Sequence, residues 1–238
     1  MGVFIVSANN KPKNVNAIVE RFDYRLVFSK KGRARFISHL DLMRTFSRIF
    51  KRAKIPVWYT QGFNPRLYIM FPLALPLGTE SDVEIMDISL TKKLDENELM
   101  QRVNDVMPEG MHINKVYTPN MSHKDISASE YEIKLRFEGL DDPAGRFNEY
   151  LSQDKVIARK FSKKKGTVEI DIKNDIKPLE VKNEGDILYI RLILPSGNDK
   201  NINTSVVVDS FEEYIGIKHS MIYTTRTKII AKNGENFT

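Results

Sequence analysis

The sequence predicts an α+β protein built from two successive units with the same order of elements, β-α-β-β-α-β. Segments with apolar residues at every second position, typical of half-buried strands, alternate with segments whose apolar residues recur at helical spacing. Each half of the 238-residue chain has four expected strands and two expected helices. Hydrophobic residues make up 41% of the chain, which is enough for a real core and excludes a wholly disordered protein.

The first unit begins with a strand that leads into a basic amphipathic helix. Alternation over Tyr24–Phe28 resumes at Ala34–Ile37 after a turn. Ser38 is the expected N-cap of the helix, with Asp41 at the capping-box position, and Pro56 ends it. The remaining expected elements are the strands Val57–Thr60, Val83–Leu90 and Met111–Tyr117 and the helix Asp95–Val106.

The second unit repeats this order less regularly. Lys163–Gly185, between its two middle strands, is expected to form an additional hairpin. We therefore predict tandem ferredoxin-like domains with antiparallel sheets at residues 23–119 and 128–232, preceded by an N-terminal arm at residues 1–22. The expected elements of this unit are strands Tyr131–Phe137, Val156–Phe161, Ile187–Leu194 and Met221–Ile230 and helices Pro143–Leu151 and Ser205–Tyr214.

Composition excludes several classes of function. The chain has no cysteine, which excludes disulfides, thiolate nucleophiles and a cysteine-ligated iron–sulfur cluster of its own. Neither a P-loop nor a dinucleotide-binding glycine fingerprint is present, so we expect no cofactor. No segment approaches the ~18 apolar residues of a membrane span, and the N-terminus lacks signal-peptide features, so we expect a cytoplasmic protein with no membrane partner.

The net charge of +6 is carried by the first half of the chain. Tyr24–Arg66 contains 11 basic residues against the single acid Asp41, an imbalance typical of proteins that bind phosphate-rich partners. The alternative is a solvated basic face balanced by the acids of Glu80–Glu109. On the first helix, four basic residues fall opposite the apolar stripe and are our first candidates for RNA binding: Arg44, Arg48, Lys51 and Arg52.

A turn-rich loop beside the basic helix supplies further candidates. Aromatic rings stack on unpaired bases and guanidinium groups hold phosphate, so Phe63, Asn64 and Arg66 are predicted to contact RNA, whereas core packing explains Trp58 and Tyr68. The loop is shaped by Gln61, Gly62 and Pro65. We expect it to line one cleft together with Ser38 and His39.

Few residues could carry catalysis or hold a metal. His39, at a helix N-terminus that favours the neutral imidazole, is either a structural residue or a general base. Four acids lie just before or within the expected strand Val83–Leu90, and their oxygens could hold Mg²⁺. Solvent exposure or salt bridges to the basic helix explain these acids better, so we expect no metal site. These acids are Glu80, Asp82, Glu84 and Asp87.

Three ordered blocks are similar to a known family. Phe36–Leu42, Gln61–Pro65 and Pro72–Gly78, followed by Glu80 and Asp87, resemble the radical-SAM-linked protein family, a domain of unknown function encoded beside, or fused to, cobalamin-binding radical SAM proteins. The resemblance implies a partner more than a reaction. A cobalamin-binding radical SAM protein would supply the cluster that this chain cannot hold.

These observations lead to one principal hypothesis and two alternatives. The principal one is a non-enzymatic accessory protein that binds RNA or a ribonucleoprotein and serves a radical SAM modification enzyme. The first alternative is a metal-independent RNA endonuclease of the CRISPR repeat-processing type, with His39 as its base. The second is a protein-binding scaffold whose basic face docks an acidic partner.

Overall fold

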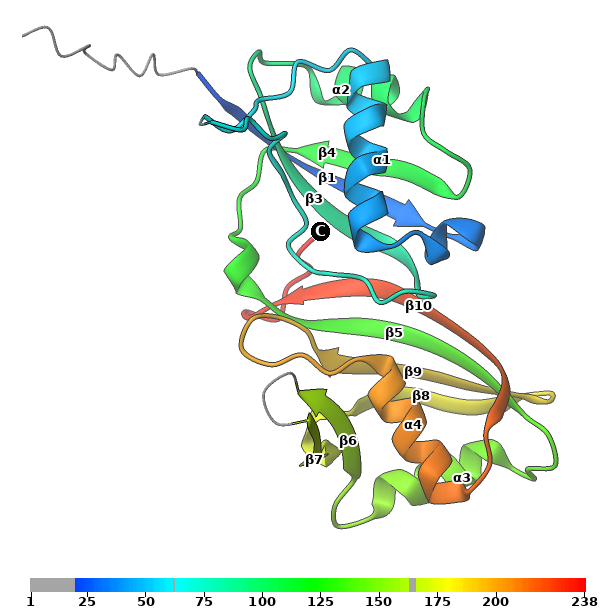
Figure 1. Ribbon diagram of the computed structural model, residues 1–238. Helices are drawn as coiled ribbons and strands as arrows, with labels where there is room; N and C mark the ends of the chain where they lie inside the picture. Colours follow the sequence, from blue (N-terminus) through cyan, green and yellow to red (C-terminus); the bar gives the residue numbers. More distant parts are fainter. Residues whose placement is uncertain (1–19, 62, 163–165) are drawn as a thin grey trace, which may run out of the picture.

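The computed structural model describes residues 20–61, 63–162 and 166–238, and it has a mixed α+β fold built on one large, mostly antiparallel sheet (Figure 1). The strand order in this sheet is β4-β1-β3-β10-β5-β9-β8, and β2 pairs with β3. The strands are β1 (Phe22–Lys30), β2 (Ile69–Met70), β3 (Glu80–Leu90), β4 (Met111–Tyr117), β5 (Ile126–Phe137), β8 (Lys177–Glu184), β9 (Ile187–Pro195) and β10 (His219–Ala231).

Helices cover the sheet in both halves of the molecule. Figure 1 shows α1 (His39–Arg52) and α2 (Glu96–Asn104) over the strands of the first half, and α3 (Pro143–Ser152) and α4 (Thr204–Ile215) over those of the second. Short 3-10 helices are η1 (Gly32–Phe36), η2 (His123–Asp125) and η3 (Lys173–Asp175). In the part of the chain that the structure describes, no helix has the length and apolar character needed to cross a membrane.

The two halves share one sheet, although the sequence led us to expect a separate sheet in each. Within each half all pairings are antiparallel, in the orders β4-β1-β3-β2 and β10-β5-β9-β8. The halves meet where the start of β3 pairs in parallel with β10, at Glu80 with Thr225 and Ser81 with Arg226. This pairing depends on residues nearly 150 positions apart, which no local pattern indicates.

Apolar side chains gather in three buried clusters. The first lies between α1, α2 and their strands and includes Phe28, Phe46 and Phe50, and the second lies under α3 and α4 and includes Phe147 and Phe211. A smaller third cluster, with Ile85, Ile126, Ile229 and Phe237, joins β3, β5, β10 and the C-terminal segment. Burial of this third cluster stabilises the junction between the halves.

Three local predictions were wrong. Residues 34–37 do not resume β1, because Gly32, at φ +56°, turns the chain into η1. Residues 57–60 form only isolated bridges, Val57 to Leu90 and Tyr59 to Leu67. The extra hairpin also pairs differently. β6 (Ile157–Ser162) and β7 (Gly166–Asp171) form a separate sheet, while β8 joins β9 and brings Val181 against the second core.

Other predictions were confirmed. α1 begins as expected at Ser38, whose hydroxyl oxygen accepts a hydrogen bond from the Asp41 backbone N–H at 3.2 Å. β4 has the predicted bounds, and α3 and α4 begin and end within one residue of theirs. Most of the arm expected at residues 1–22 lies outside the described residues, and Phe22 already belongs to β1.

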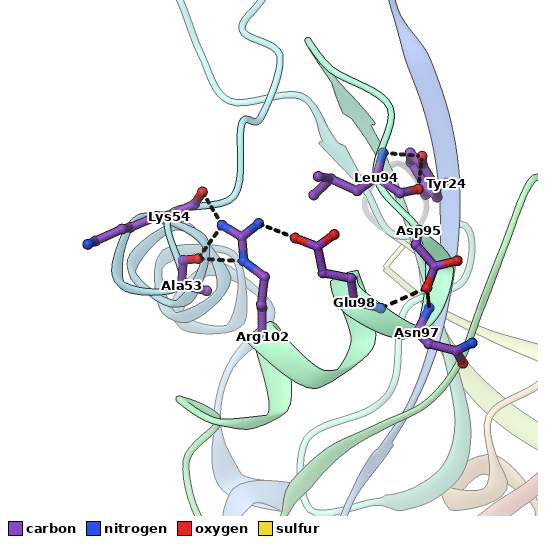
Figure 2. Close-up of polar contacts among 8 residues, drawn as sticks. All are labelled: Tyr24, Ala53, Lys54, Leu94, Asp95, Asn97, Glu98 and Arg102. Carbon is purple, nitrogen blue, oxygen red and sulfur yellow. Dashed lines mark hydrogen bonds and ion pairs between the residues drawn. The ribbon is translucent and has the colours of Figure 1, made fainter.

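The C-terminal end of α1 is held by a side chain from α2. Figure 2 shows Arg102 donating through Nη2 to the carbonyl oxygens of Ala53, at 2.9 Å, and Lys54, at 2.6 Å, while Nη1 donates to Glu98 at 3.0 Å. The turn that leads into α2 is fixed by Tyr24, whose hydroxyl donates to the Leu94 carbonyl oxygen and accepts from the Leu94 N–H. Because helix-terminal carbonyls lack intrahelical partners, Arg102 satisfies the C-terminal end of α1 and links it to α2.

Replacing Arg102 with methionine is expected to lower the free energy of unfolding by about 1–3 kcal/mol, because two carbonyl oxygens are left without a charged donor. Urea denaturation measures the change. Arg146→Met is the matched control, since the pair that Arg146 forms among the described residues, with Glu149 within α3 at 2.8 Å, is exposed, and exposed pairs contribute roughly 0–1 kcal/mol. Equal decreases in the two variants would contradict the role given to Arg102.

Candidate nucleic-acid interface

The outer face of α1 is basic and exposed, as its spacing predicts. Arg44, Arg48, Lys51 and Arg52 are all exposed, whereas the inward side chains include the buried Leu42, Phe46, Ile49 and Phe50. Arg44 pairs with Asp41 at 3.1 Å. For the other three, no carboxylate of the described residues lies within ion-pair distance. These three charges therefore face solvent without an ion-pair partner among the described residues, as in a surface that attracts polyanions.

A shallow groove of about 520 Å³ runs between α1 and the segment that leads into β2. Its basic lining comes from Arg44, Arg48 and Arg66. The remainder is mainly apolar, contributed by Leu40, Met43, Leu67 and Ile69, with Ser47. A groove that combines guanidinium groups with apolar surface suits a ligand that carries both phosphates and flat bases.

Local backbone hydrogen bonds place Arg66 at this groove. The Thr60 N–H donates to the Arg66 carbonyl oxygen at 2.8 Å, and the Arg66 N–H donates to the Thr60 hydroxyl at 3.0 Å, which closes the loop between them. Ile69 and Met70 then pair with Ile88 and Asp87 of β3. The loop therefore returns to the sheet beside α1. Arg66 has no carboxylate within ion-pair distance among the described residues.

Sequence reasoning missed the apolar part of the groove. Met43 has the helical spacing of the apolar stripe of α1, but it is only half-buried and lines the groove. Leu67 and Ile69 lie in a segment with little regular structure, so no periodicity marks them. The available signal was Leu40, because its four-residue spacing to Arg44 and Arg48 places it on the basic face of α1 rather than in the apolar stripe, and it is 56% exposed.

The loop residues before Arg66 project into solvent. Phe63 is fully exposed, and Gln61, Asn64 and Pro65 are also exposed. Gly62 lies outside the described residues. None of these side chains is among the described residues that line the groove, so Arg66 is the member of the loop set that the structure brings to α1.

Ser38 and His39 lie at the start of α1, and neither is among the described residues that line the groove. The ring of His39 is exposed and packs by its edge on Phe71, with centroids 5.3 Å apart. The Ser38 hydroxyl donates to the Asp41 carboxylate at 2.8 Å, and this bond together with Arg44 lowers the pKa of Asp41. The predicted cleft was to lie between the loop and Ser38-His39. The groove found instead includes Leu40, the residue after His39, together with Arg66 from the loop.

Trp58 and Tyr68 are not part of the buried core, contrary to expectation. Both are half-buried and meet edge to face, with ring centroids 5.8 Å apart. The Arg21 guanidinium lies over both rings, 5.5 Å and 5.2 Å from their centroids. They form a cation–π cluster at the surface, because the short bridges around residues 57–68 hold this segment at the edge of β3.

The four acids considered as metal ligands are each engaged by a base. Salt bridges were the preferred prediction, but their partners lie on β1, η1, β10 and the β1–η1 turn rather than on α1. The reason is that β3 is flanked by β1 and β10. The pairs are Arg25–Asp87 and Arg226–Glu84, each at 2.7 Å, Lys31–Asp82 at 2.5 Å and Arg35–Glu80 at 3.3 Å. No cluster of potential metal ligands occurs among residues 20–61, 63–162 and 166–238.

Comparison with known proteins gives a family but no activity. A family model described as "Uncharacterized protein conserved in bacteria (DUF2344)" matches residues 23–204. No curated protein matches. Among solved structures, a Cbf5-Nop10-Gar1 complex aligns over 87% of this chain at 11% identity with a TM-score of 0.48, and the alignment covers 48% of that chain.

A second solved structure, an unknown protein from Galdieria sulphuraria, aligns over 87% of this chain and 99% of its own length. Its identity is 14% and its TM-score is 0.26. This chain thus spans about half the length of the first of these structures, and both TM-scores lie below 0.5. Neither likeness bears on function, which must be argued from the groove itself.

Proposed function

This chain belongs to the uncharacterized bacterial family DUF2344, and we propose from its own geometry that it is a non-enzymatic accessory protein that binds RNA or a ribonucleoprotein along α1. The groove beside α1 carries the proposal. Arg48 and Arg66 enter it from two separate segments, and no carboxylate of the described residues lies within ion-pair distance of either. Two unpaired guanidinium groups beside apolar surface would hold phosphates and leave room for a base.

Each half also supports the finer fold that the sequence led us to expect. We propose that residues 23–119 and 128–232 are tandem ferredoxin-like domains. The orders β4-β1-β3-β2 and β10-β5-β9-β8, antiparallel throughout, are those that two split β-α-β units produce when they share a sheet. The β6–β7 pair is then an insertion in the second domain. The RNA groove belongs to the first.

A radical SAM partner rests on the family resemblance alone. The blocks at 36–42, 61–65 and 72–78 imply a cobalamin-binding radical SAM protein, which this chain would assist by presenting RNA. Mass spectrometry of proteins that copurify from native cells tests this part of the proposal. Recovery of a radical SAM enzyme would support the proposed partner. Its absence from complexes that do contain RNA would contradict the proposed partner.

The experiment that tests RNA binding is ultraviolet crosslinking in native cells, followed by sequencing of the RNA retained on the purified protein. We expect defined RNA species to be enriched over an uncrosslinked control. Retention of a protein partner after nuclease treatment, with no RNA enrichment, would favour the scaffold alternative. In that case the basic face would dock an acidic protein.

The nuclease alternative depends on His39. We expect the wild-type protein not to cleave RNA in the absence of metal. His39→Ala should leave RNA affinity unchanged and lower the melting temperature only slightly, because the ring is exposed and meets that of Phe71 edge to face. Loss of a general base typically lowers a rate 10²- to 10⁴-fold with little change in binding. Metal-free cleavage by the wild type that disappears in His39→Ala would overturn the non-enzymatic assignment.

A further inference from the structure

Two exposed aromatic rings from different halves of the chain flank one arginine. The Arg35 guanidinium lies over the ring of Phe36, 4.9 Å from its centroid, and over the ring of Tyr223, 4.7 Å from its centroid. Phe36 is 60% exposed and Tyr223 is 46% exposed. Phe36 belongs to η1 and Tyr223 to β10, so the fold rather than the local sequence brings them together.

The arginine between the rings is held in place. Its Nη1 donates to the Glu80 carboxylate at 3.3 Å, and its carbonyl oxygen accepts from the Gly78 N–H at 3.0 Å. The guanidinium lies against both rings, and much of each aromatic residue stays exposed to solvent. Two exposed rings that lie close together offer flat apolar surface on which a planar ligand can stack.

The segment that carries Phe36 leads directly into α1, and the first turn of α1 begins the groove. Two residues separate η1 from α1, and Leu40, Arg44 and Arg48 follow one another at intervals of four residues along the helix. Leu40 is exposed and lines the groove that Arg44 and Arg48 share. Figure 1 shows η1 at the end of α1 nearest to β10. A single strand leaving the rings would therefore meet the guanidinium groups of α1 next.

We propose that Phe36 and Tyr223 form a stacking platform for unpaired bases, and hence that the RNA bound by this protein is single-stranded along α1. This inference rests on the proposed function. Bases in a duplex are already stacked and paired, so their faces cannot reach two rings on a protein surface. The basic surroundings, with the exposed Arg33 in the same short helix, favour a polyanion over an apolar protein segment.

The test compares a fluorescently labelled 12-nucleotide RNA, single-stranded or annealed to its complement, by anisotropy at fixed salt. The wild type should bind the single strand at least about tenfold more tightly. Phe36→Leu/Tyr223→Leu should weaken single-strand binding about fivefold to 150-fold for each ring that no longer stacks on a base, with no change in salt dependence. Phe36→Tyr/Tyr223→Phe keeps both rings and should bind as the wild type does.

Tyr214→Leu is the matched control, because Tyr214 is 40% exposed but lies on α4, away from η1 and α1. Its affinity should equal that of the wild type. Full single-strand affinity in the Phe36→Leu/Tyr223→Leu variant, or equal binding of duplex and single strand by the wild type, would overturn the platform and leave the groove intact. Loss of a copurifying protein with RNA affinity unchanged would also overturn it. Absence of any RNA binding by the wild type would remove the proposed function itself.

Discussion

Arg226→Met should lower the free energy of unfolding by about 3–5 kcal/mol, the largest decrease expected from any single substitution considered. Arg226 is buried and donates to the Glu84 carboxylate at 2.7 Å, to the Ala74 carbonyl oxygen at 3.0 Å and to the Tyr131 hydroxyl at 3.2 Å. Burial acts against its charge, but Glu84 and Tyr131 outweigh burial and raise the pKa of Arg226. Removal of the guanidinium leaves the buried Glu84 without its cation.

Chemical denaturation of three variants separates this effect from general disruption. Arg226→Met/Glu84→Met, which removes both charges, should recover most of the missing stability, because buried ion pairs are often replaceable by apolar side chains. Arg191→Met should cost no more than about 1 kcal/mol, since Arg191 is only partly buried and lies 3.8 Å from Glu130. A decrease in Arg226→Met no larger than in Arg191→Met would show that this pair does not hold β3 and β10 together.

Arg48→Ala/Arg66→Ala should weaken RNA binding by at least about tenfold at moderate salt, the largest functional effect we expect. Both side chains line the groove with no carboxylate of the described residues within ion-pair distance, so their removal takes charge from the groove without breaking an ion pair. The slope of log affinity against log salt should fall by roughly 0.7 for each phosphate of a single strand that no longer meets an arginine.

Arg136→Ala/Arg146→Ala is the matched control for this measurement. It removes the same charge from exposed arginines of the second half that already pair with Asp186 and Glu149, both at no more than 2.8 Å. Its affinity and salt slope should stay close to those of the wild type. Equal changes in both double variants would mean that RNA responds to net charge alone and not to the groove.

The sequence was sufficient to predict the features that depend on residues close together in the chain. The amphipathic spacing of α1, its Ser38 cap and its exposed arginines follow from residues within a few turns of one another, so the sequence was sufficient to find them. The Arg226–Glu84 pair joins residues 142 positions apart, and the Phe36–Arg35–Tyr223 arrangement joins residues that are still further apart in sequence. Such arrangements depend on the pairing of β3 with β10, which has no local signal.

The sequence was sufficient to predict the arginines of the candidate site but not the groove that they share. Arg44, Arg48 and Arg66 could be named from charge and position, but their common groove depends on Leu67 and Ile69, which an irregular segment returns to α1. The pairing of β8 with β9 was missed for a related reason. The short strands β7 and β8 could pair with each other, but β7 pairs with β6 and β8 with β9. The packing of Val181 beside Ile190 favours the observed pairing, and this is a tertiary effect that no local pattern shows.

The most direct test of the central claim, that RNA lies along α1, is to crosslink a photoreactive single-stranded RNA to the purified protein and map the modified peptides by mass spectrometry. We predict crosslinks within residues 39–52 and 66–70, with further crosslinks at Phe36 and Tyr223, and we predict that Arg48→Ala/Arg66→Ala greatly reduces the first two groups. Crosslinks confined to residues 128–218, or an unchanged pattern in that variant, would contradict the claim.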